Sequence, residues 1–250
     1  MNRPAILVTG GAKRIGELLS RAFAAAGWHV VIHCNTSRPA ADTLAATLPS
    51  AEVVQCDLAH PHAAVAMVEA LAARLADWRV LVNSAAVFEL DTAAAILPAV
   101  HAEAMAVNAL TPTLMAQTFL AHARASAGRR VINFLDQKLA NPNPDFFSYT
   151  MAKHALAAAT TMLAMAQADP ADRVYGLAPG AMLPSFDQRA EEHEISGRMN
   201  LLHRITEPQE LADAALWLAT GWLASGETIF VDSGQHLLAQ PRDVLYLARQ

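Results

Sequence analysis

The sequence predicts an α/β protein, a single domain over residues 1–250 in which helices cover both faces of a doubly wound parallel sheet of about seven strands. Short runs rich in Val, Ile and Leu alternate with longer Ala- and Leu-rich runs along the chain. The short runs are too apolar for a sheet with a solvated face, which indicates a sheet buried on both sides. No repeat, linker or change of composition divides the chain, and 250 residues is a common length for one such domain.

Seven segments are predicted to be strands because they are short and rich in β-forming residues. They are 5–9, 29–33, 51–56, 79–83, 129–134, 173–178 and 227–231. Helices are predicted between them, notably over 14–26, 61–77, 98–125, 147–168 and 207–219. Residues 180–206 mix Pro, Gly and charged side chains, so we expect a substrate loop that acts as a lid. Residues 239–250 are expected to be a C-terminal tail that could reach a neighbouring subunit's site.

Composition and charge narrow the possible functions. The net charge is −5 and no Lys/Arg run exceeds two residues, so we expect neither nucleic acid nor a membrane surface as partner. The N-terminal apolar run of five residues is too short for a signal peptide, and no later run has the length of a membrane span. We therefore expect a cytoplasmic protein. Cys34 and Cys56 form no metal-binding motif and are expected to be reduced thiols, and no metal site is predicted.

A glycine-rich loop follows the first predicted strand and precedes a helix. Ligands of an open parallel sheet bind at the carboxyl ends of its strands. Glycines there let the backbone turn tightly and approach a pyrophosphate, while the helix N-terminus offers N–H groups and a partial positive charge. The sequence therefore predicts a dinucleotide site that is formed by Gly10, Lys13, Arg14, Ile15 and Gly16.

The loop after the second strand favours NADPH. An NAD site usually has Asp or Glu here, and that carboxylate would repel a 2′-phosphate. This loop instead offers Asn35, Thr36 and Ser37 as hydrogen-bond donors, with Arg14 or Arg38 as a source of positive charge. Two later strand ends complete the expected cofactor site, with Asp57 and Leu58 near the adenine and with Asn83, Ser84 and Ala85 as a polar turn against the cofactor.

Tyr149 and Lys153 stand four residues apart at the start of a predicted helix, so they lie on one face of it. A phenol normally titrates near pH 10. An adjacent ammonium favours the phenolate, so we expect this pair to exchange a proton with a carbonyl-type atom near neutral pH.

Together these motifs resemble the short-chain dehydrogenase/reductase family over residues 4–238. The resemblance rests on Thr9-Gly10 with Arg14 and Gly16, on residues 83–86, on Asn108, on Tyr149 with Lys153, and on Pro179-Gly180. It implies a Rossmann fold, hydride transfer from a nicotinamide, a homotetramer, and cofactor contacts at Pro179 and Gly180. It further implies that Tyr149 donates the proton, that Lys153 binds the nicotinamide ribose and tunes Tyr149, and that Asn108 holds a proton-relay water.

The family normally has a serine thirteen residues before the tyrosine, where this chain has Asp136. A carboxyl group with a raised pKa can deliver a proton to a ring nitrogen, whereas a serine hydroxyl can only share its proton. In this the chain is similar to the pteridine and dihydromonapterin reductases, which its loop GGAKRIG (10–16) and its YTMAK (149–153) also resemble. Phe88 stands where that branch has an aromatic side chain that stacks the pterin against the nicotinamide.

The chain departs from that branch at several positions. Thr36 stands in place of an arginine, Ala86 in place of a serine that touches the pterin, and Ser84 in place of the usual second asparagine. The final strand ends in VDSG (231–234) rather than in paired glycines. No catalytic group is lost, but the identity of the substrate is left open.

The sequence thus predicts an NADPH-dependent reductase of a pteridine-like substrate, such as a dihydropterin, dihydromonapterin or dihydrofolate. The expected catalytic residues are Asn108, Asp136, Tyr149 and Lys153, and the expected substrate contacts are Arg14, Phe88, Asp136 and Tyr149. Two alternatives remain. One is an NADPH-dependent reductase of ketones or 3-oxoacyl thioesters in which Asp136 only orients Tyr149, and the other is a dinucleotide-binding regulator without catalysis. In structural terms, Asp136 could be only a turn residue and Phe88 only a packing residue.

Overall fold

The computed structural model describes residues 3–185 and 187–250. Its centre is a parallel sheet with the strand order β3-β2-β1-β4-β5-β6-β7. The strands are β1 (Ala5–Val8), β2 (His29–Cys34), β3 (Ala51–Gln55), β4 (Trp78–Asn83), β5 (Arg130–Phe134), β6 (Arg173–Pro179) and β7 (Thr228–Val231). The chain winds from β1 outward to β3 and then from β4 outward to β7. This confirms the doubly wound sheet, whose strand order reverses between β1 and β4.

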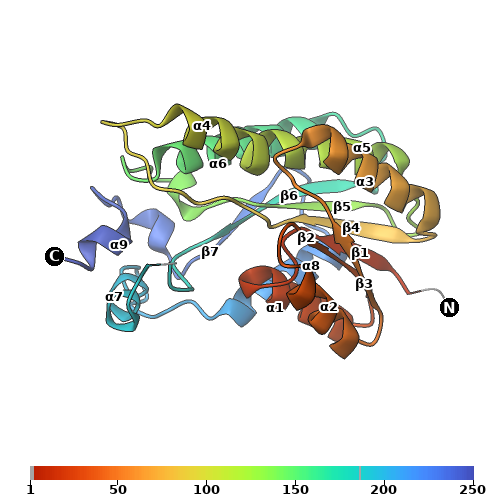
Figure 1. The fold of residues 1–250 in the computed structure, drawn as a ribbon, viewed down its shortest axis with the longest axis horizontal. Coiled ribbons are helices and arrows are strands. Elements are labelled where there is room, and N and C mark those ends of the chain that lie inside the picture. Colours follow the sequence, from red (N-terminus) through yellow and green to blue (C-terminus); the bar gives the residue numbers. More distant parts are fainter. Residues whose placement is uncertain (1–2, 186) are drawn as a thin grey trace.

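Helices cover both faces of the sheet (Figure 1). One face carries α1 (Arg14–Ala25), α2 (Arg38–Thr47) and α8 (Pro208–Thr220), and the other carries α3 (Pro61–Arg74), α4 (Pro98–Met105), α5 (Thr111–His122) and α6 (Phe147–Met165). The sequence did not single out α2, although Pro39 in its first turn is a typical start signal. Shorter elements are η2 (Gln137–Leu139), α7 (Ala190–Ser196), η3 (Gln235–Leu237) and α9 (Val244–Leu247).

The helix predicted over 98–125 is divided in the structure. Between α4 and α5 lies a π-helical turn, η1 (Ala106–Leu110), at whose end the N–H of Thr111 bonds to the carbonyl of Ala106, five residues back. Pro112 follows at once and has no backbone N–H, so the regular i to i−4 pattern cannot continue through this position. The buried Asn108 lies inside this turn.

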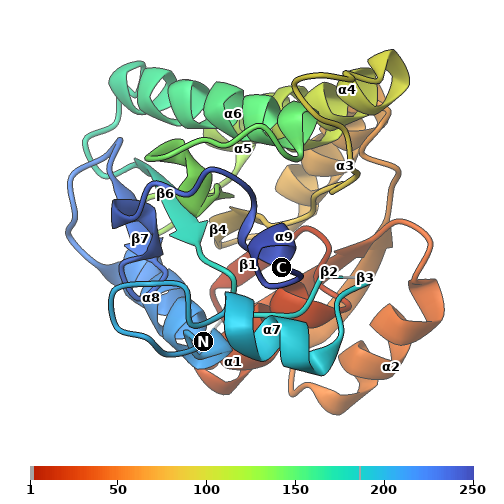
Figure 2. The ribbon, with the colours of Figure 1, turned by 90° about the vertical axis from the view of Figure 1, so that its left-hand side faces the viewer.

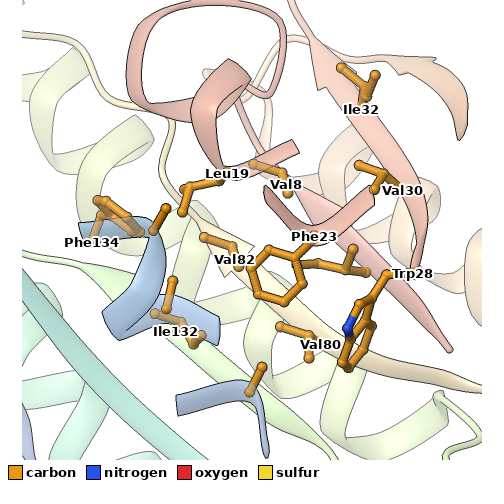
Figure 3. Close-up of a cluster of buried hydrophobic side chains, with 14 of the residues drawn as sticks. Val8, Leu19, Phe23, Trp28, Val30, Ile32, Val80, Val82, Ile132 and Phe134 are labelled. Atoms are coloured by element: carbon orange, nitrogen blue, oxygen red, sulfur yellow. The ribbon is translucent and has the colours of Figure 1, made fainter. Parts of the chain in front are cut away.

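The core forms on both faces of the sheet because successive strand residues point to opposite sides. Figure 3 shows Leu19 and Phe23 of α1 among Val8, Val82 and Ile132 of the sheet, all fully buried. On the other face, Phe119 of α5 packs edge-on against Trp78, with ring centroids 4.7 Å apart. Burial on both faces explains why the strands are so uniformly apolar.

The carboxyl ends of the strands point toward the side of the molecule where α7 and α9 lie (Figure 1). There α7, from the irregular stretch 180–206, lies beside α9 of the C-terminal tail, as the view onto this side shows (Figure 2). The tail therefore covers the sheet end of its own chain. Among the described residues, no helix is long and apolar enough to cross a membrane.

Candidate active site

The loop between β1 and α1 is fixed mainly by backbone contacts. Gly10 has a φ of +64°, and a Cβ at Gly16 would lie 2.1 Å from the carbonyl oxygen of Gly10. Only glycine therefore fits at residue 16 while the loop keeps this turn. Thr9 ties the loop to the end of β4, because its hydroxyl oxygen accepts hydrogen bonds from the N–H groups of Ser84 (2.9 Å) and Ala85 (3.0 Å).

His33 joins the ends of three strands, a role that sequence reasoning did not assign to it. Its Nδ1 accepts from the N–H of Gly10 at 3.1 Å, and its Nε2 lies 3.0 Å from the carbonyl oxygen of Cys56. These contacts require the neutral tautomer with the proton on Nε2. Burial lowers the pKa of His33, which favours the same neutral form.

A cavity of about 500 Å³ runs along the carboxyl ends of β1, β2 and β4. It brings together fifteen of the seventeen residues predicted to bind the cofactor. They are Gly10, Lys13, Arg14, Ile15, Gly16, Asn35, Thr36, Ser37, Asp57, Leu58, Ser84, Ala85, Tyr149, Lys153 and Pro179. The first cavity also includes His33, Cys34 and Glu103, which were not predicted.

Two predicted cofactor residues lie outside this cavity. Asn83 is buried behind it, and its amide donates to Asn133 Oδ1 at 2.8 Å and to the carbonyl of Pro112 at 3.2 Å. Asn83 therefore holds β4 against β5 and α5. Gly180 lines a second, adjoining cavity. A Cβ on Gly180 would come within 2.6 Å of Gln235 Oε1, so this glycine permits the close approach of Gln235.

Tyr149 and Lys153 lie in the first turns of α6 and on one face, with Lys153 Nζ 5.5 Å from the centroid of the Tyr149 ring. Both are buried, and Lys153 Nζ donates to the carbonyl of Phe134 at 2.6 Å. Burial lowers the pKa of Lys153 to about 8. The structure thus confirms the shared face of the helix.

The expected lowering of the Tyr149 pKa is wrong for the protein without its ligands. Burial raises this pKa well above 10, and the adjacent Asp136 carboxyl raises it further. Sequence reasoning considered the ammonium of Lys153 alone, but the phenol hydroxyl donates to Asp136 Oδ2 at 3.0 Å. A nearby carboxylate disfavours a second negative charge.

Asp136 lies just beyond β5 and has two contacts that define its position. Its Oδ1 accepts from the N–H of Lys138 at 2.8 Å, which starts η2, and its Oδ2 accepts from Tyr149. The contact of Oδ1 confirms the turn interpretation, while the catalytic role of Asp136 stays a prediction. Burial is the main cause that raises the pKa of Asp136, against the opposing effects of Lys138 and Tyr149.

Asn108 touches the site through Val87. Its Oδ1 accepts from the N–H of Val87 at 2.9 Å and its Nδ2 donates to the carbonyl of the same residue at 2.8 Å. This two-fold contact fixes the segment that carries Phe88. The role of Asn108 with a relay water stays a prediction.

The second cavity, of about 400 Å³, continues from the first past Tyr149. All four predicted substrate residues line it: Arg14, Phe88, Asp136 and Tyr149. Phe88 stacks on Phe146 with ring centroids 4.0 Å apart and meets Tyr149 edge-on at 4.7 Å. Because 43% of Phe88 is still exposed, it combines a packed position with a surface free for a ligand.

Arg14 connects the two cavities and lines both. It has a φ of +53°, so it keeps a left-handed backbone that is more usual for glycine. Its guanidinium donates to the carbonyl of Pro184 at 2.9 Å, which links the glycine loop to the substrate loop.

Most of the remaining wall of the second cavity comes from the substrate loop, η3 and the tail. These segments contribute Gly180, Ala181, Met182, Leu183, Ser185, Gln188, Ser196, Gln235, Asp243, Val244 and Leu245. Gln235 Oε1 accepts from the N–H of Ala181 at 2.9 Å, while its Nε2 has no acceptor among the described residues. Neither Gln235 nor Asp243 was predicted, because neither belongs to a local motif. In the described part of the chain, no cluster of His, Cys, Asp and Glu could hold a metal ion.

Comparisons with known proteins agree with this geometry. The model of the family described as enoyl-(acyl carrier protein) reductase matches residues 10–236. A protein assigned as ketoacyl reductase 2 of the granaticin polyketide synthase of Streptomyces violaceoruber is 29% identical over 94% of this chain and 97% of its own. Pteridine reductase 1 of Leishmania tarentolae is 28% identical over 94% of this chain and 96% of its own.

Among solved structures, FolM alternative dihydrofolate reductase 1 from Brucella canis, in complex with NADP, is 35% identical. The superposition covers 95% of each chain with a TM-score of 0.88. The matches span the glycine loop, the Tyr149–Lys153 pair and the strand ends that carry Asp136 and Pro179. The chain therefore belongs to the short-chain dehydrogenase/reductase family.

Proposed function

We propose that this protein is an NADPH-dependent reductase of a pteridine-like substrate, a dihydropterin, dihydromonapterin or dihydrofolate. The observation that carries this proposal is Asp136, a buried carboxyl with a raised pKa that is bonded to Tyr149 and shares a cavity with Phe88. A carboxyl whose pKa burial raises carries a proton more readily than an exposed one, and this one lies beside a surface on which a flat ring could stack. The names of the Leishmania and Brucella relatives support the same substrate class.

The first cavity fits NADPH. Gly10 and Gly16 of its glycine loop line the cavity, and the absence of a Cβ at Gly16 lets the loop keep the tight turn that a pyrophosphate site needs. At the end of β2 it presents Asn35, Thr36 and Ser37 and no carboxylate, which suits a 2′-phosphate. Arg14 lines the same cavity as a cation, whereas Arg38 is paired with Asp42. The Brucella relative binds NADP, in agreement with this choice.

When bound, NADPH supplies a hydride to a ring carbon of the substrate. We propose that Asp136, in its protonated form, gives the proton to the adjacent ring nitrogen, since burial shifts its pKa in the direction that favours this form. Tyr149 supports this acid through its hydrogen bond and is the second proton donor. Lys153 holds the nicotinamide ribose, and Phe88 stacks the substrate ring. Arg14 contacts the substrate beside the glycine loop.

The second candidate is reduction of ketones or 3-oxoacyl thioesters, which the Streptomyces relative favours. Met182, Leu183, Val244 and Leu245 give the second cavity apolar patches that would also suit an acyl chain. In this case Asp136 would only orient Tyr149.

One assay separates the two. NADPH oxidation is followed with dihydrobiopterin, dihydromonapterin, dihydrofolate, a panel of ketones and a 3-oxoacyl thioester. We expect turnover of at least one pteridine and a loss of about 10²-fold or more in Asp136→Ser, because general acid catalysis commonly contributes that much. Turnover of ketones or thioesters alone, or full pteridine turnover by Asp136→Ser, would contradict the proposal.

We also propose that residues 1–250 act as one domain, with 180–206 as substrate loop and 239–250 as tail, in a cytoplasmic homotetramer. Support for assembly comes from large apolar side chains on two helical surfaces, Met162 and Met165 of α6 (61% and 81% exposed) and Trp222 after α8 (83% exposed). Sedimentation of the purified protein tests this, with one species of four chains as the expected result.

A further inference from the structure

The C-terminal tail places a carboxylate in the substrate cavity. Asp243 precedes α9, lines the second cavity and is 8% exposed. Its Oδ1 accepts from the N–H of Leu245 at 3.0 Å, which caps α9. Its Oδ2 forms an ion pair with Nζ of Lys138, which is itself only 4% exposed.

Further buried contacts hold the ion pair between Lys138 and Asp243 in place. The side chain of Asp145 accepts from the N–H of Asp243 at 2.8 Å and from Arg242 Nε at 2.7 Å, and it is 2% exposed. Lys138 Nζ lies 3.4 Å from the carbonyl oxygen of Asp145 and 5.0 Å from the ring centroid of Phe146. Residues 138–146 and the tail are thus joined by buried charges about a hundred residues apart in sequence. A buried ammonium without a counter-ion would be costly.

The pair lies next to the proposed acid. Lys138 is two residues from Asp136 and its N–H donates to Asp136 Oδ1. The charged and titratable groups around Asp136 are Lys138 from η2, Tyr149 and Lys153 from α6, Asp243 from the tail, and Arg14 from the glycine loop. Of the two tail-linked charges, Lys138 lowers the pKa of Asp136 and Asp243 raises it.

We propose that Asp243 is a positioning residue of the reaction, which by neutralising Lys138 keeps Asp136 in the protonated form that donates to the substrate. The inference rests on the proposed function only in that Asp136 is the acid. It makes the tail a part of the proton-delivery machinery, because Asp243 acts on Asp136 through Lys138. Without Asp243 the unpaired ammonium of Lys138 stabilises the Asp136 carboxylate, so the acid form is lost at a lower pH.

The test is the pH profile of kcat/KM in Asp243→Asn. Asparagine keeps the helix cap and the shape but removes the charge. We expect the alkaline limb of the profile to move to lower pH by about one unit or more, the size typical of an opposite charge at close range. Lys138→Met removes the cation instead, and its limb should move to higher pH. In the double variant Lys138→Met/Asp243→Asn both charges are gone, and the limb should return toward that of the wild type.

Asp187→Asn is the matched control. Asp187 also binds the tail, through Arg249, but its side chain is 66% exposed and does not line the second cavity. Its loss should leave the limb in place. A merely structural role of Asp243 would lower turnover at all pH values without moving the limb, and would make the double variant worse than either single one. Either result overturns the inference.

A second readout separates this inference from the proposed function. The carboxyl signal of Asp136 is titrated by ¹³C NMR in the NADP⁺ holoenzyme, with Asp136→Asn used to assign it. We expect its midpoint to fall in Asp243→Asn whether or not a pteridine is turned over. If no pteridine reacts but the midpoint falls, the substrate assignment fails and the coupling stands. If the midpoint does not move, the coupling fails. If Asp243→Asn does not fold, the same titration is done with Lys138→Met, in which the midpoint of Asp136 should rise. An unchanged midpoint in that variant would also refute the coupling.

Discussion

At the cofactor end of the cleft, backbone atoms and short polar side chains hold the loop after β1, whereas at the substrate end ion pairs between distant segments hold the wall. Gly16 packs against Gly10 within the loop, while Thr9 and His33 join strand ends that are neighbours in the sheet. Asp243 instead reaches Lys138 across about a hundred residues. The cofactor end is therefore fixed by the fold itself, while the substrate end depends on side chains that can change without changing the fold.

The largest effect on stability and cofactor binding is expected from Gly16→Ala, which changes the cofactor end of the cleft. The new Cβ would lie 2.1 Å from the backbone oxygen of Gly10, which cannot move aside without opening the loop. We expect a loss of stability of about 3 kcal/mol, at the upper end of the usual cost of overpacking, and NADPH binding weakened beyond detection by fluorescence titration. Gly27→Ala is the control, since nothing lies within 4 Å of its Cβ and only its positive φ adds strain, of about 1 kcal/mol. If Gly16→Ala binds NADPH normally, the backbone account of this end fails.

Deletion of residues 242–250 should impair only the substrate end of the cleft. The deletion removes Asp243 and Arg249 and opens one wall of the second cavity. We expect kcat/KM for the substrate to fall by at least 10²-fold, as loss of positioning can cost that much. The dissociation constant for NADPH should change less than threefold. Equal losses of substrate and NADPH binding would show that the two ends are not separate.

Lys153 lies where the cofactor end and the substrate end of the cleft meet. The pH dependence of stability tests how deeply its ammonium is buried there. Its pKa in the folded protein is about 8, below the value of about 10.4 for a free lysine. Between these pH values the unfolded chain binds more protons, so this group makes the protein more stable as the pH rises from about 8 toward 10. We expect a rise of up to about 3 kcal/mol in the free energy of unfolding of the wild type, relative to Lys153→Met, from chemical denaturation at each pH. A wild type whose stability changes in parallel with that of Lys153→Met would refute the burial effect.

The smallest effect is expected from Arg249→Gln. Arg249 binds Glu192 and Asp187 at 3.2 Å each and so connects the tail to the substrate loop, but its side chain is 29% exposed. Because partly exposed ion pairs contribute about 1 kcal/mol at most, we expect KM for the substrate to rise two- to fivefold, and less at high salt. The control is Arg198→Gln. Arg198 follows α7, the helix that contains Glu192, and forms an exposed ion pair with Glu194 of that helix, so its loss should leave KM unchanged. A salt-independent loss in Arg249→Gln would mean that packing and not charge holds the tail.

The same contrast explains what the sequence could predict. Every predicted strand lies within one residue of an observed one, because two-sided burial imposes a strong apolar pattern. Residues at strand ends, such as Arg14, Ser37 and Pro179, line the expected cavity because topology alone brings strand ends together.

The errors arise where side-chain contacts decide. The pKa of Tyr149 depends on its burial and on Asp136, thirteen residues away. The contacts of His33, Gln235 and Asp243 join segments that are distant in sequence, so neither periodicity nor local spacing predicts them. Within one chain, α9 and its ion pair hold the tail over the chain's own site, and the expected reach to a neighbour's site stays a prediction.

The π-helical turn at 106–110 has a consequence for how such chains change over evolutionary time. Each residue of an α-helix turns the chain by about 100°, so loss of one residue between Thr111 and Met115 would rotate the rest of α5 by that angle. Met115 and Phe119, now fully buried, would then swing away from the sheet. The π-helical turn holds about one residue more than an α-helical turn, so loss of one of its residues other than Asn108 would tighten the turn and leave α5 close to its present orientation. Insertions and deletions should therefore be absent from residues 111–122 in functional homologues, while the π-helical turn and the exposed loops around Gly27 or Trp222 should tolerate the loss of a residue.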